Sequence, residues 1–143
     1  MKSTLRFFLL LTALSSFILT ACETTDTSTT GDDSRDPYVG VWQFAESGKS
    51  IHGQSYIVTI TKDAGNSEQV LLENFGNPGT SSVSVTGLVT TNQIVVTSQN
   101  MGNGWSVEGS GKITDANKTK MTWTYSITAG GDKTTYTAYA TKL

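Results

Sequence analysis

The chain has 143 residues, of which 10 are Lys or Arg and 12 are Asp or Glu, so its formal net charge is -2 at pH 7. Such a balance leaves no strong positive field to attract nucleic acid, and we expect no nucleic-acid partner. One cysteine and one histidine are too few to build a structural zinc site.

The first segment of the chain, residues 1–21, has the three parts of a secretory signal peptide. Lys2 and Arg6 form a positive end, an apolar run follows from Phe7 to Leu19, and small residues come next. The apolar run is shorter than the roughly 20 residues that a transmembrane helix needs. We therefore predict that residues 1–21 direct export and are then removed.

The only cysteine, Cys22, follows this signal directly. The sequence Leu19-Thr20-Ala21-Cys22 resembles the lipobox of bacterial lipoproteins. The resemblance implies cleavage before Cys22 and attachment of acyl chains such as palmitate to it, which gives a stable membrane anchor. Glu23 follows, whereas an Asp there resembles an inner-membrane retention signal, so we expect the outer membrane, on its periplasmic or its surface face. The alternative is a soluble secreted protein with a free cysteine.

The next segment is acidic and contains no apolar side chain. Residues 23–36 hold five carboxylates and a single basic residue, Arg35. A segment of this composition cannot bury enough apolar surface to fold. We predict that residues 22–36 comprise the lipidated cysteine and a disordered acidic tether. The acidic run also resembles surface-export signals of some Gram-negative lineages, and both interpretations stay open.

Residues 37–143 show the alternation of apolar and polar side chains that is typical of half-buried β-strands. Two further segments, Val70–Leu72 and Ile94–Val96, are apolar on both faces, so a neighbouring segment or a partner would cover them. The apolar face of each alternating strand comprises Trp42 and Phe44, then Tyr56, Val58 and Ile60, then Val83, Val85 and Val89, then Trp105, Val107 and Ile113, then Met121, Trp123, Tyr125 and Ile127, and finally Tyr136, Ala138 and Ala140.

Short segments rich in Gly, Asn, Asp and Ser separate these strands, and each is short enough to close a hairpin. The sequence therefore predicts an all-β domain, an antiparallel up-and-down meander of about eight strands. An open meander would expose two sheet edges, so we expect it to close into a small barrel. The predicted turns are residues 63–67, 76–80, 91–92, 100–104, 115–119 and 130–132.

The start of the first strand, Gly40-Val41-Trp42, resembles the opening of lipocalin-type barrels. In that family the Trp plugs one end of the barrel and a basic residue of the last strand packs over it, for which Lys142 is the nearest counterpart. The layout of the whole mature chain also resembles short lipocalin-like, calycin-type lipoproteins of Gram-negative bacteria. The chain differs from lipocalins in its short length and lack of disulfides. An eight-stranded barrel either fills with side chains or holds one small ligand.

No cluster of residues predicts catalysis, a metal site or a cofactor. His52 lies in the predicted loop 48–54, where no strand would hold it as a base beside a nucleophile. Glu108 lies on the face opposite Trp105, which predicts an outward position. Asp115 starts a segment that imitates a calcium loop, but its later positions lack the required Gly and Glu, so we predict a turn. We therefore expect no enzyme activity, no metal and no cofactor, and a hydrolase ranks last among the functions considered.

Two functional hypotheses rank above a hydrolase. In the first, the anchored barrel binds a small apolar ligand, lipid or glycan in its interior or mouth. In the second, the barrel is solid and meets a protein partner, and Gly109-Ser110-Gly111 resembles the recognition segment of small lipoproteins that inhibit lysozyme, although a strand bend explains it equally. The candidate ligand-binding residues are Trp42, Trp105, Trp123 and Tyr125.

Overall fold

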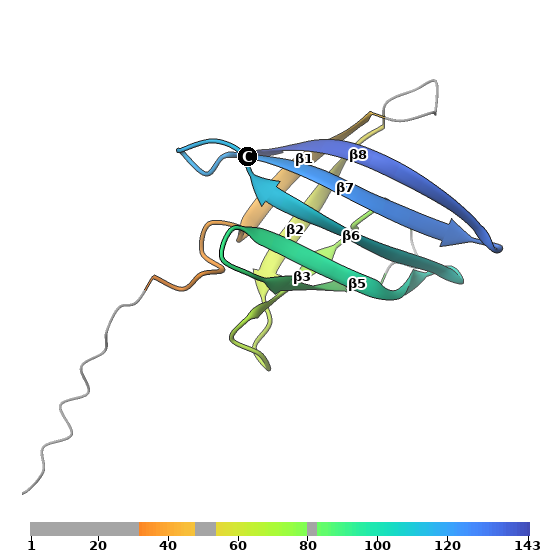
Figure 1. Cartoon of the computed structure of the whole chain (residues 1–143), viewed down its shortest axis with the longest axis horizontal. Helices are drawn as coiled ribbons and strands as arrows, with labels where there is room; N and C mark the ends of the chain where they lie inside the picture. The colour runs from red at the N-terminus through yellow and green to blue at the C-terminus, as the bar shows by residue number, and fades with distance from the viewer. Residues whose placement is uncertain (1–31, 48–53, 80–82) are drawn as a thin grey trace, which may run out of the picture.

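The computed structural model describes residues 32–47, 54–79 and 83–143. These residues form eight antiparallel strands, each hydrogen-bonded to the next in sequence, and the last strand returns to the first to close a barrel (Figure 1). The predicted all-β meander is thus confirmed. The strands are β1 (Gly40–Ser47), β2 (Ser55–Lys62), β3 (Gln69–Glu73), β4 (Val85–Val89), β5 (Gln93–Gly102), β6 (Trp105–Ile113), β7 (Lys120–Ala129) and β8 (Asp132–Lys142).

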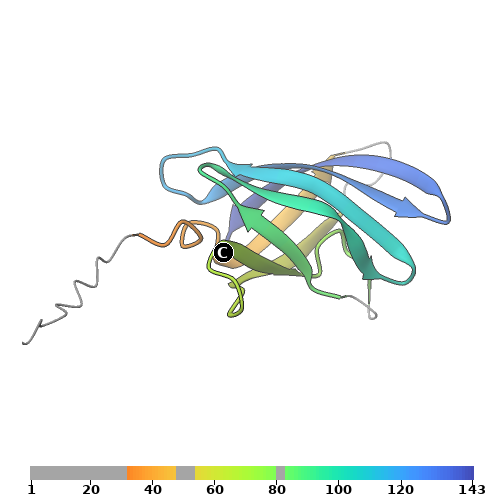
Figure 2. The same cartoon turned by 60° about the horizontal axis from the view of Figure 1, so that its bottom comes forward.

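Alternation along the strands places the apolar faces inside the barrel, as predicted. Turning the molecule shows the strands curving around one common interior (Figure 2). The fourth face differs from the prediction, because Val83 precedes β4 and is 53% exposed. The predicted turn at residues 100–104 is also shorter, since β5 continues to Gly102 and only Asn103 and Gly104 turn, both with positive φ. Such φ values suit the tight turn of a β-hairpin.

The two segments that are apolar on both faces belong to β3 and β5. Their inward side chains, such as Leu72 and Ile94, are fully buried. Their outward side chains, Leu71 and Val95, are half-buried; Leu71 pairs with Thr86 of β4, and Val95 pairs with Leu88 of β4, which is 39% exposed. Neighbouring strands therefore cover part of this outer apolar surface.

Aromatic rings fill the middle of the barrel. Phe75, from the loop after β3, lies 4.8 Å from Trp123, 4.9 Å from Tyr125 and 6.0 Å from Phe44 between ring centroids. All four side chains are at most 1% exposed. These separations are typical of aromatic rings in contact in a protein core. The interior at this level is therefore occupied by side chains.

The end of the barrel where β1 begins is closed by Trp42. Its indole N–H donates to the carbonyl of Tyr38 at 2.7 Å. Lys142 Nζ lies 5.3 Å from the centroid of the Trp42 ring and donates to the carbonyl of Pro37, so the contact expected for Lys142 is present. Gly40 has a φ of 138°, and a Cβ there would lie 2.8 Å from Lys142 Cε. Glycine at this position therefore allows the lysine to approach.

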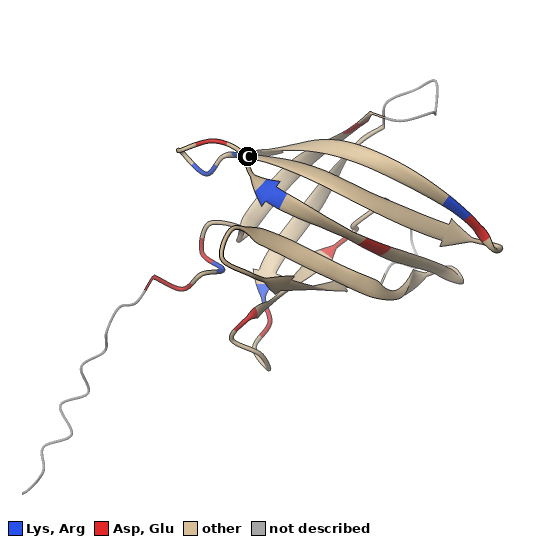
Figure 3. Cartoon of the chain, in the orientation of Figure 1, with Lys and Arg blue, Asp and Glu red and all other residues tan. Residues whose placement is uncertain are grey.

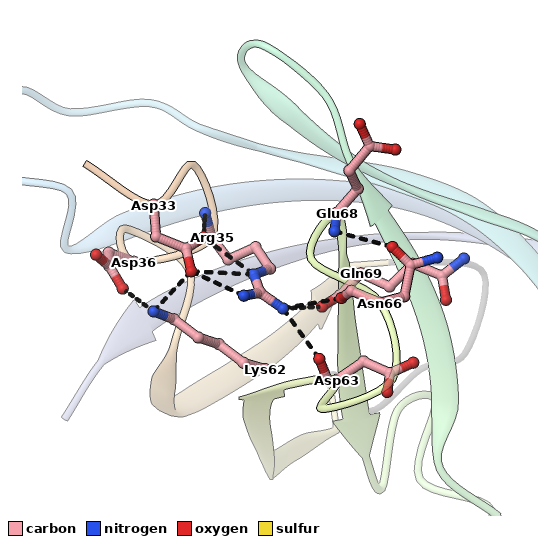
Figure 4. A network of polar contacts seen from close by, with 8 residues as sticks. All are labelled: Asp33, Arg35, Asp36, Lys62, Asp63, Asn66, Glu68 and Gln69. Carbon is pink, nitrogen blue, oxygen red and sulfur yellow. Dashed lines mark hydrogen bonds and ion pairs between the residues drawn. The ribbon is translucent and has the colours of Figure 1, made fainter. Parts of the chain in front are cut away.

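The segment before β1 is attached to the same end of the barrel (Figure 4). The guanidinium of Arg35 donates to the carboxylate of Asp33 and to the carbonyls of Asp63, Asn66 and Gln69, at distances between 2.8 and 3.3 Å. These carbonyls belong to the turn between β2 and β3, so a buried cation crosslinks the two segments.

Lys62 at the end of β2 adds ion pairs of 2.9 Å to Asp33 and 2.5 Å to Asp36. Hydrogen bonds from Arg35 and then Lys62 hold the pKa of Asp33 well below its usual range. The predicted tether ended at Asp36, whereas Asp33, Arg35 and Asp36 lie against the barrel. Composition alone does not predict this attachment, because charged side chains are expected to face solvent. Here the guanidinium of Arg35 instead donates hydrogen bonds to backbone carbonyls.

Candidate functional site

The opposite end of the barrel is hollow. A pocket of about 390 Å³ lies where β1 and β7 end and where β2, β6 and β8 begin, beside the β3–β4 loop. In Figure 1 this is the end at which the β7–β8 hairpin turns, away from the C-terminus. We call it the mouth. Its lining residues are Glu46, Gln54, Gly76, Asn77, Trp105, Ile127, Ala129, Asp132, Thr134 and Tyr136.

The floor of the mouth is a carboxylate held by two tyrosines. Glu46 follows Trp42 and Phe44 at the inward positions of β1, so its side chain faces the interior. The hydroxyl of Tyr125 donates to Glu46 Oε1, and the hydroxyl of Tyr56 lies 3.0 Å from the same oxygen. The two hydroxyls are 2.9 Å apart. The three polar groups form one compact cluster above the aromatic core.

Burial keeps these two tyrosines neutral. It raises the pKa of both Tyr56 and Tyr125 well above the ordinary value of 10.0, and the nearby Glu46 carboxylate raises both further. A phenol that does not ionise remains a hydrogen-bond donor across the physiological range. The acidic character of the floor therefore comes from Glu46 alone.

Aromatic and polar side chains share the wall of the mouth. Trp105 and Tyr136 are partly buried, and the Tyr136 ring stacks on Tyr125 with 5.5 Å between centroids and 21° between planes. Asp132 in the β7–β8 hairpin adds a second carboxylate. Among the described residues, no Lys or Arg lines the mouth. Elsewhere acidic and basic residues lie mostly toward the ends of the strands and in the turns (Figure 3).

A second hollow lies at the closed end, between the segment before β1 and the β4–β5 and β6–β7 turns. Its lining includes Asp33, Thr91, Asn117 and Lys142 but no aromatic side chain. Small-molecule sites are lined mainly by apolar and aromatic side chains with a few polar groups, whereas turn residues and charged side chains line this hollow. The mouth fits that description better.

The four predicted ligand-binding residues lie at different levels of the barrel. Trp42 is fully buried at the closed end, and Trp123 is fully buried in the aromatic core. The hydroxyl end of Tyr125 reaches the floor of the mouth, and Trp105 lines its wall. The structure thus brings Trp105 and Tyr125 to one site and keeps Trp42 away from it.

Sequence reasoning did not assign Glu46, Asp132 or Tyr136 to a binding site. Tyr136 was recognised only as part of an apolar face. The signal for Glu46 was its inward parity with Trp42 and Phe44, which places an acidic side chain where a core residue is expected. That signal becomes meaningful only when β2 and β7 bring tyrosines to the same level.

Trp123 leaves one buried polar atom without a partner. Its Nε1 makes no hydrogen bond with any described residue, and its ring occupies the space in front of Gly111. Packing against aromatic rings therefore fixes this indole.

Glu108 and Asp115, the described residues considered for catalysis or metal binding, do not line the mouth. Glu108 faces outward as predicted and pairs with Lys133 across 2.5 Å. Asp115 accepts hydrogen bonds from the backbone of Thr119 and Lys120, which makes the segment the predicted hairpin turn. Within residues 32–47, 54–79 and 83–143, no three His, Cys, Asp or Glu side chains are arranged to hold a metal. His52 and Cys22 lie outside the described residues.

In the same part of the chain, no helix has the length and apolarity to cross a membrane. Neither models of known protein families nor curated protein sequences match the chain.

Proposed function

We propose that this protein is a lipid-anchored outer-membrane lipoprotein whose small barrel acts without catalysis and binds a small ligand at its mouth. The observation that carries the binding proposal is the pocket of about 390 Å³ with a carboxylate floor and aromatic walls. Small-molecule sites typically have volumes of about 300 to 1,000 Å³ and combine apolar surface with a few fixed polar groups. The mouth has this size and composition.

The filled interior decides where the ligand would sit. Phe44, Phe75 and Trp123 occupy the level below the floor and are at most 1% exposed. Opening a cup there would require large core side chains to move, at a cost of several kcal/mol. A ligand at the mouth needs no such rearrangement. The lipocalin resemblance is thus retained for the barrel, and of the two places expected for the ligand, the interior and the mouth, we propose the mouth.

Tryptophan fluorescence tests binding at the mouth. Trp105 lines the pocket, while Trp42 and Trp123 are fully buried. Titration with small aromatic compounds and sugars should change the emission of the full chain, and Trp105→Phe should remove that change. If no compound alters the emission and calorimetry detects no heat of binding, the binding proposal fails.

The anchor has a separate test. The Leu19 to Cys22 match supports acylation of Cys22. Cys22→Ala should therefore move the protein from the membrane fraction to the soluble fraction and abolish labelling by an alkyne analogue of palmitate. Ser28→Ala, further along the predicted tether, is the matched control and should leave both unchanged. Membrane retention of the Cys22 variant without label would contradict the anchor.

A protein partner is the second candidate function. It is favoured by the filled interior and by the outward apolar residues Leu71, Leu88 and Val95 on neighbouring strands. Of the segment that resembles lysozyme inhibitors, Gly109 and Gly111 face the interior and only Ser110 faces outward. Leu88→Lys should weaken binding of such a partner and should leave the affinity of ligands for the mouth unchanged.

A further inference from the structure

The charged side chains among the described residues that line the mouth are all acidic. Glu46 and Asp132 are both acidic, and no described lining residue is basic. The nearest basic residue in sequence to Asp132 is Lys133, whose ammonium pairs with Glu108 on the outer surface. Acidic groups in a hollow attract ligands of opposite charge, because the surrounding protein focuses their field.

Among the described residues, the floor carboxylate is held by two tyrosine hydroxyls and by no cation. Both tyrosine hydroxyls approach Glu46 Oε1, and Oε2 accepts no hydrogen bond from any described residue. Glu46 is only partly exposed, and carboxylates withdrawn from water are normally paired with a cation. Here the described residues supply two neutral phenols instead. A cationic ligand would supply the missing partner.

The wall supplies the second feature of a cation site. Trp105 and Tyr136 line the mouth together with the carboxylates. Aromatic rings attract organic cations through their negative faces, and Trp does so best. A neutral apolar ligand would use the rings but leave the carboxylates desolvated without a partner.

From this arrangement we infer that the mouth binds a small organic cation bearing an amine or quaternary ammonium group. The cationic group lies at Glu46 and Asp132, and the rest of the ligand packs on Trp105 and Tyr136. The inference rests on the proposed function, since it names the chemistry of the ligand that the mouth binds. It excludes anionic ligands and ranks neutral sugars below their amino counterparts.

Matched pairs of ligands test the charge requirement. Calorimetry on the full chain in an uncharged detergent would compare benzylamine with benzyl alcohol. In mildly acidic buffer it would compare the disaccharide of glucosamine, with both amines protonated, with its N-acetylated form. Each charged member should bind at least about tenfold more tightly than its neutral counterpart, the usual worth of one hydrogen bond to a charged group.

Variants locate the charge. Glu46→Gln keeps an acceptor for the tyrosine hydroxyls but removes the charge, so it should weaken binding of the charged member about tenfold and leave the neutral member unchanged. Asp132→Asn lies on an exposed hairpin, so it keeps the test valid if the Glu46 variant fails to fold. Glu108→Gln is the matched control on the outer surface and should change neither affinity.

Three outcomes distinguish the preference for a cation from the proposed binding of a ligand at the mouth. Preference for the charged members that is lost in Glu46→Gln or Asp132→Asn supports the inference. Equal binding of charged and neutral members overturns it and leaves binding at the mouth intact. If none of the four compounds binds, the proposed binding function fails together with the inference.

Discussion

Gly111 makes room for the largest ring of the core. It lies directly opposite Trp123 on the neighbouring strand, and a Cβ at position 111 would collide with the indole. Gly109 stands in the same relation to Tyr125. Cross-strand partners are the closest neighbours in a sheet, so a large ring on one strand requires a small residue on the next. The Gly-Ser-Gly segment is explained by packing.

Replacement of this glycine tests that explanation. Gly111→Ala should lower the free energy of unfolding by about 1 to 3 kcal/mol, because the added methyl group overpacks the core. Urea unfolding measures the loss, and near-ultraviolet circular dichroism should show a change around tryptophan. Gly65→Ala is the control, since Gly65 lies in an exposed turn with a single neighbour at 3.4 Å. Equal stability of the two variants would contradict the packing role.

Among the elements, the segment before β1 is attached to the β2–β3 turn through the side chain of Arg35. The carbonyl of Arg35 accepts hydrogen bonds from the amides of Tyr38 and Val39, while its guanidinium binds the β2–β3 turn. Arg35→Met should release the segment and raise the hydrogen-exchange rates of these two amides at least about tenfold, because charge-assisted contacts that hold the segment are lost. Mass spectrometry of exchange measures this.

Lys112→Met on the exposed face of β6 is the matched control and should leave exchange unchanged. The pKa of Asp33 is lowered in the folded protein, so the segment gains stability from Asp33 above the ordinary value of 3.8 and loses it as pH falls below that value. Exchange of the segment should therefore increase relative to the strands in acid. Protection of the two amides in Arg35→Met at the level of the original protein would show that other contacts hold the segment.

The strands could be predicted from sequence periodicity, whereas the mouth could not. Strands such as β7, where Met121, Trp123, Tyr125 and Ile127 alternate with polar residues, could be predicted because burial on one face leaves a period of two. The mouth could not be predicted from the sequence, because Glu46 and Tyr125 are 79 positions apart and come together only through the strand register of a closed barrel. Phe75 was missed for a related reason, since it enters the core from a loop, where no period marks it.

For the molecule as a whole, the buried tyrosines set an upper pH limit on stability. Tyr56 and Tyr125 have folded pKa values raised above their ordinary value of 10.0, so the unfolded chain releases their protons first as pH rises. The stability that these two tyrosines contribute is therefore complete below about pH 10 and falls above it. The urea midpoint should hold steady through neutral pH and decline in alkali.

The variants Tyr56→Phe and Tyr125→Phe should flatten that alkaline decline, because each removes one group that titrates differently in the two states. Tyr139→Phe is the control, since Tyr139 is 59% exposed and its removal should not change the slope. An identical alkaline slope in all three variants would show that other groups cause the decline.

The two ends of the barrel also give the protein a direction. The chain enters at the closed end, where Arg35 fixes it, and the mouth opens at the other end of β1. The ten peptide steps from Cys22 to Asp32 span at most about 35 Å when fully extended, close to the length of an 11-residue strand such as β8. If Cys22 carries the anchor that we propose, the closed end would lie nearer the lipid and the mouth would open toward the aqueous side.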